Sequence, residues 1–352
     1  MPTWTEILTE INGGSNNPPA SVDDVRKKYL KLLGIHNNRN IIAYYSGWLI
    51  PKPDDFNSSI NDLDKHALMS VIAGLDKTKG LDLILHTPGG SIDATESIVD
   101  YLWTVFNKDI RVIVPQLAMS AGTMIACSAR QIIMGKHSNL GPFDPQMFSP
   151  GIGFNVPAQG VLDEYKVAID QIQNNPASTP LWQTIYSRVH PSFINECMLA
   201  MKHSESLVKK WLIENMLIGK DTKNNLADTI VDKLSDHDKT KSHGRHISRE
   251  ECVALGLEIV ELEQDQIMQD LVLSVHHAFM ITFSQTQARK IVENNNGLTN
   301  ASLMPVLQSP HQFIVPQNLI PTLQSEEDVS KSEKRNSINV LGRARRFIKS
   351  FY

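Results

Sequence analysis

Two consecutive stretches decide the fold: LDLILHTPGGSIDATESIVDYLW (81–103) and IRVIVPQLAMSAGTMIACSARQIIMG (110–135). Each begins with a short apolar run of the length expected for a strand of a parallel sheet. Small residues follow the strand, and a pattern typical of a helix follows them. We therefore expect an α/β fold with strands at 81–86, 110–115 and 132–135, and with helices at 92–106 and 122–130.

The first turn, Thr87-Pro88-Gly89-Gly90-Ser91, combines a rigid residue with two flexible ones. Pro88 fixes its own φ, whereas Gly89 and Gly90 allow backbone geometries closed to other residues and a close approach of a ligand to the main chain. Ser91 is a suitable N-cap for the helix that follows.

The second turn places Ser120 between Met119 and the small residues Ala121 and Gly122. A serine at a sharp strand-to-helix turn is the setting of a nucleophile elbow, because its Oγ projects outward and the next N–H points at the atom attacked. Gly90 N–H and Ala121 N–H are predicted to form an oxyanion hole, with Gly89 and Gly122 beside them. The simpler alternative is that Ser120 only caps a helix, but two such turns one unit apart favour the site.

Three segments carry a resemblance to a known family: HTPGG (86–90), PQLAMSAGTMIACSARQIIMG (115–135) and GPFDPQ (141–146). They resemble the serine dehydrogenase proteinase (SDH-type) family of Clp-fold serine peptidases, in the Clp/crotonase superfamily and related to signal peptide peptidase A. The likeness covers roughly 40–295. It implies a Clp/crotonase-like fold of repeated strand–turn–helix units with a helical insert. Where that family tends to read SGGT, this chain has Ser120-Ala121-Gly122-Thr123, and alanine still supplies the N–H.

The general base is the open question of this resemblance. In Clp proteases a histidine lies on the stretch that here carries Asp144, and aspartate is a poor base for serine. His137 on the same connection is one substitute, with a solvated loop histidine as the alternative. The Ser–Lys dyad of signal peptide peptidase A makes Lys166 our first candidate, provided that it is desolvated. His243 and His246 are second-line candidates.

Composition bounds the class of protein. The chain has 352 residues, 41% of them hydrophobic, which suffices for a sizeable core. A net charge of −4 gives no reason to expect nucleic-acid binding. Cys127, Cys197 and Cys252 are scattered, which suits a reducing compartment and offers no metal spacing. We see neither a signal peptide nor a transmembrane run, and we expect a cytoplasmic protein.

We predict four regions along the chain. They are an N-terminal helical arm (1–40), a peptidase domain (41–262) with a helical insert at about 160–235, a C-terminal helix (263–300, with helix expected over 265–297) and a flexible tail (301–352). The basic end of the tail, 341–352, is a candidate for contact with an anionic membrane surface. Asp62, Asp64 and His66 could suggest a metal site, but acids are expected near a helix N-terminus because of the helix dipole, so we predict no metal there. We also predict no cofactor.

The resemblance implies a serine peptidase that hydrolyses peptide bonds through an acyl-enzyme on Ser120, acts on peptide or protein substrates and forms a homo-oligomer of three, six or more subunits. Two alternatives stay open. One is a catalytically inactive scaffold that binds peptides, and the other is acyl-CoA chemistry of the crotonase type. The serine at the turn and the lack of an evident basic cluster for adenine binding argue against the second.

Overall fold

The computed structural model describes residues 3–13, 18–51, 58–149, 153–190 and 192–303. All of them belong to one compact unit, Met1–Met304. The rest of the predicted tail, including the basic end 341–352, lies outside the described residues. No helix of the described part is long and apolar enough to cross a membrane.

A seven-stranded sheet forms the centre of this unit, in the order β10-β5-β3-β2-β1-β11-β12. The strands are β1 (Asn40–Ser46), β2 (Leu81–His86), β3 (Ile110–Val114), β5 (Gln131–Met134), β10 (Ile259–Glu261), β11 (Ala288–Asn294) and β12 (Thr299–Leu303). From β10 to β1 all neighbours are parallel, and β11 and β12 are added antiparallel. The α/β class and its repeated strand–turn–helix plan are therefore confirmed.

The two predicted units lie side by side. β2 leads into α4 (Ile92–Phe106), and β3 leads through the short β4 (Leu117–Ala118) into α5 (Ala121–Ser128). Because β2 and β3 are parallel, their turns meet at one edge of the sheet, where Thr87 forms a bridge with Ala118. Met119 N donates to Thr87 O at 3.0 Å, which joins the glycine turn to the serine turn.

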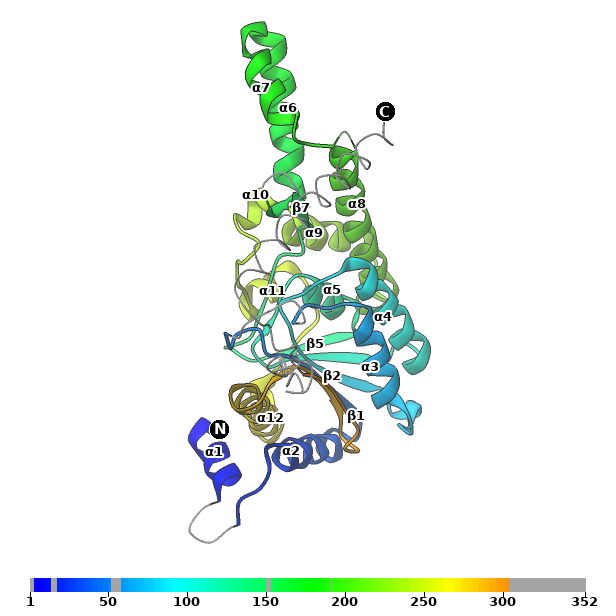
Figure 1. Ribbon diagram of the computed structural model, residues 1–352. Coiled ribbons are helices and arrows are strands. Elements are labelled where there is room, and N and C mark those ends of the chain that lie inside the picture. The colour runs from blue at the N-terminus through cyan, green and yellow to red at the C-terminus, as the bar shows by residue number, and fades with distance from the viewer. Residues whose placement is uncertain (1–2, 14–17, 52–57, 150–152, 191, 304–352) are drawn as a thin grey trace, which may run out of the picture. The chain divides into compact units, whose positions relative to one another are not determined.

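Helices cover both faces of the sheet (Figure 1). On one face lie α2 (Val22–Asn37) and α12 (Gln266–Gln285), and on the other lie α3 (Asp62–Ile72), α4 and α5. Side chains of a strand alternate between the faces, so Ile41 and Tyr45 of β1 join the α12 core while Ile42 and Tyr44 join the α4 core. The arm helix α1 (Trp4–Asn12) packs against α12.

The remaining elements follow α5 or lie between the strands. The other α-helices are α6 (Ala158–Asn174), α7 (Thr179–Tyr186), α8 (Phe193–Trp211), α9 (Lys223–Ser235), α10 (His237–Thr240) and α11 (Arg249–Leu255). The short strands are β6 (Asn139–Leu140), which pairs with β4, β9 (Ile247–Ser248), which pairs with β6, and the hairpin of β7 (Gln146–Ser149) and β8 (Phe154–Pro157). The single-turn helices are η2 (Lys77–Lys79), η3 (Pro176–Ser178), η4 (Leu212–Met216) and η5 (Leu262–Gln264).

One predicted element is wrong in its extent. The helix expected over 265–297 ends at Gln285, and residues 288–294 form β11, which pairs with β1 inside the sheet. All seven residues of this strand are buried. Its charged residues Lys290 and Glu293 obscured the strand pattern in the sequence, yet both are buried because each has an ion-pair partner, Asp64 and Arg26 respectively.

Candidate active site

Ser120 lies at the N-terminus of α5 with an unusual backbone. Its φ is 52° and its ψ is −117°, a combination that costs free energy for any residue other than glycine. Its side chain makes no capping hydrogen bond to the helix, so the hydroxyl is not used as a cap. Such a turn directs Oγ away from the helix and into the space above it, as expected for a nucleophile elbow.

Two backbone N–H groups beside Ser120 have no acceptor in the part of the chain that the structure describes. Within the described residues, neither Gly90 N–H nor Ala121 N–H donates a hydrogen bond. By contrast, Gly89 N donates to Thr87 Oγ1 at 3.2 Å and Gly122 N donates to Met119 O at 2.8 Å. Only the first two N–H groups are therefore available to an oxyanion, which is the pair expected from the sequence.

Gly89 and Gly122 serve close packing. A Cβ at Gly89 would lie 2.6 Å from Ser120 Cβ and 2.8 Å from Met119 O. A Cβ at Gly122 would lie 2.5 Å from Thr87 Cγ2. The two turns approach each other this closely because neither glycine carries a side chain.

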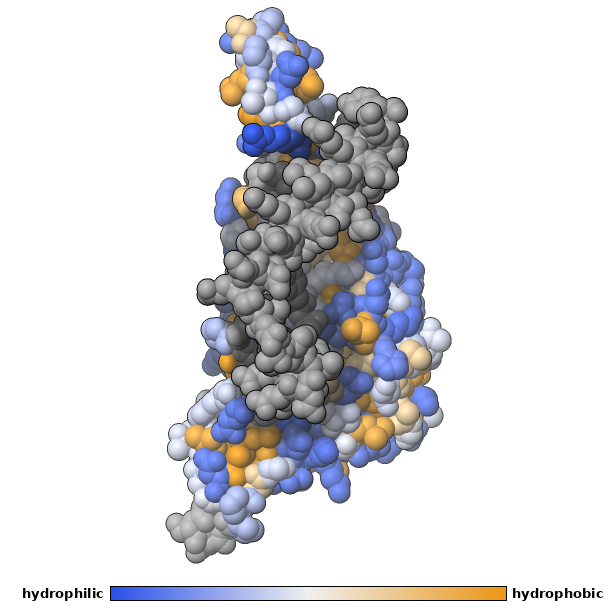
Figure 2. Space-filling view, viewed as in Figure 1, coloured by the Kyte–Doolittle hydropathy of each residue, from blue (hydrophilic) through white to orange (hydrophobic). Residues whose placement is uncertain are grey.

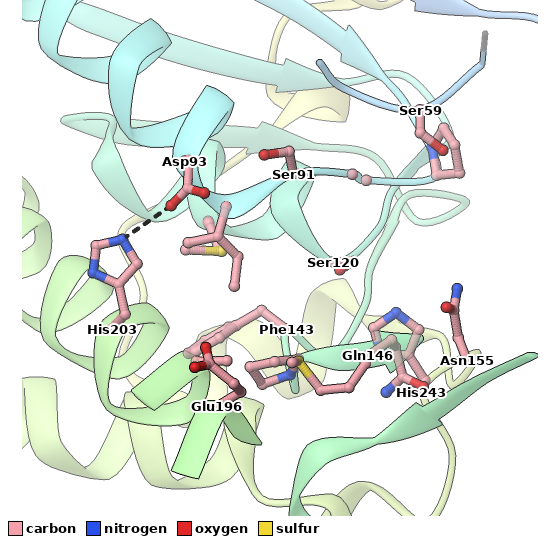
Figure 3. Close-up of a pocket in the computed structure, with 18 of the residues that line it drawn as sticks. Ser59, Ser91, Asp93, Ser120, Phe143, Gln146, Asn155, Glu196, His203 and His243 are labelled. Atoms are coloured by element: carbon pink, nitrogen blue, oxygen red, sulfur yellow. Dashed lines mark ion pairs between the residues drawn. The ribbon is translucent and has the colours of Figure 1, made fainter. Parts of the chain in front are cut away.

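Ser120 opens into a cleft of about 820 Å³ (Figure 3). The glycine turn and the start of α4 line one side, α8 and the β7–β8 hairpin line the other, and His243 lies on a loop before β9. Its lining residues are Ser59, Pro88, Gly89, Gly90, Ser91, Ile92, Asp93, Ser120, Met124, Phe143, Pro145, Gln146, Met147, Asn155, Glu196, Leu199, Ala200, His203 and His243. The lining combines apolar side chains such as Met124, Phe143 and Leu199 with polar and charged ones.

Asp144 is buried under this cleft, with 1% of its side chain exposed. His243 Nδ1 lies 2.7 Å from one of its carboxylate oxygens, and His237 Nδ1 lies 3.1 Å from the other. Gln146 Nε2 donates to the carboxylate at 2.8 Å. An ionised carboxylate only accepts, so a neutral His243 that donates to it carries its proton on Nδ1 and presents Nε2 as an acceptor. Ser120 and His243 therefore line the same cleft, and His243 contacts the buried carboxylate of Asp144.

The structure does not bring the other candidate bases to Ser120. The Lys166 side chain is 72% exposed on α6, pairs with Asp163 at 2.9 Å and lies outside the set that lines the cleft. It is therefore not desolvated, as a dyad lysine must be. His137 is exposed with its ring against Gly135, and His246 is exposed on its loop, and neither lines the cleft.

Some residues of the cleft or of its surroundings went unnoticed in the sequence. His237 is outside the set that lines the cleft and lies on a four-residue helix with no motif, and Asp144, the one partner it shares with His243, is more than ninety positions away from both. His203 of α8 faces Asp93 and Glu96 of α4 at 3.6 and 3.4 Å. Glu196 precedes His203 by two helical turns and lines the same wall. The i, i+3, i+4, i+7 spacing of Glu196, Leu199, Ala200 and His203 is the only sequence signal that unites them.

The remaining side chains that could take part in catalysis or metal binding have structural roles or are buried. All three cysteines are buried and free, and burial raises the pKa of the Cys252 thiol to about 12, so it is not a thiolate nucleophile. Asp64 completes a capping box with Asn61 at the start of α3 and binds Lys290. Within the described residues no group of histidines, cysteines and carboxylates is arranged to hold a metal ion.

The sequence of this region is similar to known proteins. Residues 58–175 match the family described as ClpP-like SDH-type serine proteinases, which confirms the predicted resemblance over that segment. Two uncharacterized proteins of Methanocaldococcus jannaschii are similar as well. The first is 39% identical over 124 residues, which make up 32% of this chain and 43% of the relative. The second is 38% identical over 102 residues, 29% of this chain and 32% of the relative.

The chain therefore spans less than half the length of these two relatives. Among solved structures, a mutant of the 1510-N membrane-bound stomatin-specific protease matches 57% of this chain and 74% of its own, with 18% identity and a TM-score of 0.35. The matched segment 58–175 contains Ser120, both turns and Asp144. Over this segment the chain is similar to ClpP-like SDH-type serine proteinases.

Proposed function

We propose that this protein hydrolyses peptide bonds with Ser120 as nucleophile, His243 as general base and Asp144 as the residue that orients His243. One observation supports this proposal above all: His243 lines the same cleft as Ser120, and its Nδ1 lies 2.7 Å from a buried carboxylate oxygen. The site then requires no lysine base. The chain order Ser120, Asp144, His243 differs from the order of the Clp proteases, and the triad is recognised by roles and geometry rather than by order.

The chemistry follows from these roles. Ser120 Oγ attacks the scissile carbonyl carbon while His243 Nε2 takes the hydroxyl proton. Gly90 N–H and Ala121 N–H hold the oxyanion of the tetrahedral intermediate. His243 then returns the proton to the departing amine, which leaves an acyl-enzyme on Ser120. Water, deprotonated by His243, attacks that ester, and the acid product leaves with Ser120 restored.

The resting structure is not yet aligned for proton transfer. Among the described residues no hydrogen bond joins Ser120 Oγ to His243. Catalytic hydrogen bonds are often loose without substrate and tighten only in the complex. We propose that peptide binding in the cleft brings Nε2 of His243 onto Ser120 Oγ.

The test is the rate at which a fluorophosphonate probe labels the intact protein, read by mass spectrometry. We expect one adduct that disappears in Ser120→Ala. His243→Ala and Asp144→Asn should slow labelling by about a thousandfold or more. Lys166→Met should label like the parent, and so should His246→Gln, a matched exposed histidine on the loop of His243. Fast labelling in His243→Ala together with loss in Lys166→Met would replace our triad with a Ser–Lys dyad.

The alternative function is a scaffold that binds peptides without cleaving them. It predicts no adduct on the folded parent protein and unchanged peptide affinity in Ser120→Ala. An acyl-CoA enzyme would instead bind coenzyme A, which isothermal titration calorimetry would detect. The strained backbone of Ser120 favours the peptidase, because such strain is typical of functional residues.

We also propose that the protein acts as a homo-oligomer. The described part exposes large apolar side chains on α6, α7 and the β7–β8 hairpin, and Figure 2 shows hydrophobic side chains among hydrophilic ones on the helices α6 and α7. They include Phe148, Phe154, Val167, Ile169, Leu181 and Ile185. We propose that these side chains contribute to a contact between subunits.

A further inference from the structure

A short segment outside the proposed triad determines the path of the glycine turn. We call residues Ser58–Asn61 the strap. Ile60 N donates to Gly89 O at 2.7 Å, and Ser91 N donates to Ile60 O at 2.9 Å. The contact is so close that a Cβ at Gly90 would lie 2.3 Å from Ile60 O. The direction of Gly90 N–H therefore depends on where the strap lies.

The strap is itself fixed by side chains from the sheet and from α3. Ser46 Oγ donates to Ser58 O at 2.6 Å, and Asn61 N donates to Asp64 at 2.8 Å. Lys290 Nζ donates to Ser59 O at 2.9 Å. Ser59 lines the cleft, so Lys290 acts directly behind its wall.

Lys290 is held in turn by a buried carboxylate. Its ammonium donates to the two oxygens of Asp64 at 2.6 and 2.7 Å, so with Ser59 O it has an acceptor for each of its three protons. Tyr44 OH also donates to Asp64, at 2.9 Å. The side chains of Lys290 and Asp64 are each 5% exposed. Burial lowers the pKa of Lys290, and the charge of Asp64 acts in the opposite direction.

Such a pair contributes fixed geometry more than stability. Removing two charges from water costs about as much as their attraction returns, and replacing a buried pair with uncharged residues is often neutral. A buried lysine with three partners nevertheless has a single position, because any displacement leaves an unpaired charge. It is therefore suited to hold a backbone carbonyl in place.

We propose that Lys290, anchored by Asp64, is a positioning residue for the oxyanion hole: it fixes the strap, and the strap fixes Gly90 N–H. This inference rests on the proposed function of Ser120 and Gly90. An oxyanion donor binds the transition state and not the bound substrate. We call the Lys290–Asp64 pair the clamp. Its loss is therefore expected to lower kcat and kcat/KM by the same factor and to leave KM unchanged.

The experiment compares two buried ion pairs, each of which includes one residue of β11. Lys290→Met with Asp64→Asn removes both charges, and the amide oxygen of the new residue can still accept from Tyr44 and Asn61, which share one oxygen of Asp64. The matched control is Arg26→Met with Glu293→Gln, which removes another buried pair that involves β11 and lies outside the cleft. Each variant is assayed for hydrolysis of a peptide ester, for fluorophosphonate labelling and for amide hydrogen exchange.

We expect kcat and the labelling rate to fall about tenfold or more in the Lys290 double variant, with KM unchanged, and to stay at the parent value in the control. Exchange should accelerate at 58–61 and 89–91 only in the former. Ser46→Ala, a smaller release of the same strap, should reproduce part of both effects if the double variant fails to fold. Unchanged kcat with unchanged exchange would overturn the proposal.

The outcome also separates this inference from the proposed function. If the parent protein hydrolyses no ester and takes up no probe, the peptidase proposal fails, whereas hydrogen exchange still reports whether Lys290 holds the strap. If the parent is active and exchange rises without a change in kcat, the clamp exists but does not position the oxyanion hole, and our inference is refuted.

Discussion

At Gly89 the absence of a Cβ atom allows the two turns of the site to pack closely. Its φ is +100°, a backbone conformation that residues with a side chain rarely adopt, and a Cβ there would clash with Ser120 Cβ and Met119 O. We expect Gly89→Ala to lower the free energy of unfolding by about 2 kcal/mol or more, through backbone strain and overpacking. Because the clash is with Ser120 itself, the labelling rate should fall further than stability explains. Urea denaturation and probe labelling measure the two effects.

Gly160 of α6 provides the control for that substitution. A Cβ there would meet only Pro157 Cβ at 3.9 Å, which is an ordinary contact. Gly160→Ala is expected to gain up to about 1 kcal/mol from helix propensity and to label like the parent. Equal losses in both variants would mean that the two turns are not packed as closely as the structure indicates.

His86 makes the stability of the fold sensitive to acid. Its ring is fully buried between Tyr45, Trp48 and His276, and within the described part neither ring nitrogen has a hydrogen-bond partner. Burial lowers its pKa from 6.5 to about 4. The unfolded chain therefore binds a proton at a higher pH than the folded one, and stability is lost as the pH falls from about 6.5 towards 4.

The expected size of this loss is about 3 kcal/mol for His86 alone, from the difference between the two pKa values. His276, whose pKa burial also lowers, adds to it in the same direction. Denaturation midpoints at pH 7 and pH 4.5 measure the loss, and His86→Phe, which keeps a ring without a titratable group, should show a smaller one. A midpoint that does not change with pH would contradict a neutral, buried His86.

At the scale of elements, the sequence predicts those helices and strands whose signals lie within a few residues of one another. The strand 81–86 and the helix 92–106 have the predicted limits, because apolar runs, Ser91 as N-cap and the glycine turn all act within a few residues. β11 could not be recognised in the same way. Lys290 and Glu293 are tolerated in this buried strand because their partners, Asp64 and Arg26, come from segments more than two hundred residues away.

The two ends of the parallel strands differ in their proposed roles. The N-terminal end of β2 carries a buried ion-pair network, and the proposed active site lies at the C-terminal ends. Asp82, at the N-terminal end of β2, is fully buried and bonded to Arg39, Arg111 and Asn37 at 2.6 to 2.8 Å. Asp82→Asn should cost about 3 kcal/mol, because it leaves two arginines without their buried partner. Asp109→Asn removes a more exposed partner of Arg39 and should cost under about 1 kcal/mol.

Both variants are expected to label at the parent rate when folded, because Ser120 lies at the opposite, C-terminal end of the strands. Thermal unfolding followed by circular dichroism measures the stability of each variant, and probe labelling at low temperature measures the site. A slow labelling rate in well-folded Asp82→Asn protein would show that the two ends of the sheet are coupled.

At the scale of the whole molecule, the site depends on contacts that no spacing in the sequence reveals. Gly90 lies in the first strand-to-helix turn, Ser120 and Ala121 lie in the second, and their roles are predicted from the chemistry of these turns. His243 lies 99 residues beyond Asp144, and the sequence named it only as a second-line candidate together with His246. The packing of its loop beside the cleft distinguishes His243 from His246. Lys166 was preferred in the sequence for its position in the chain, whereas burial, which decides whether a lysine can act as a base, is a property of the fold.

Assembly is the remaining property at this scale, and α7 offers a direct test of it. Leu181 and Ile185 are 61% and 46% exposed and lie one helical turn apart. If α7 belongs to a contact between subunits, Leu181→Lys with Ile185→Lys should dissociate the oligomer, because buried lysine charges are costly. Multi-angle light scattering should then report a smaller mass with unchanged circular dichroism. Leu63→Lys on α3, where the leucine is 74% exposed, is the control and should keep the parent mass. A parent protein that is monomeric at every concentration, or a double variant with the parent mass, would exclude α7 from any subunit contact.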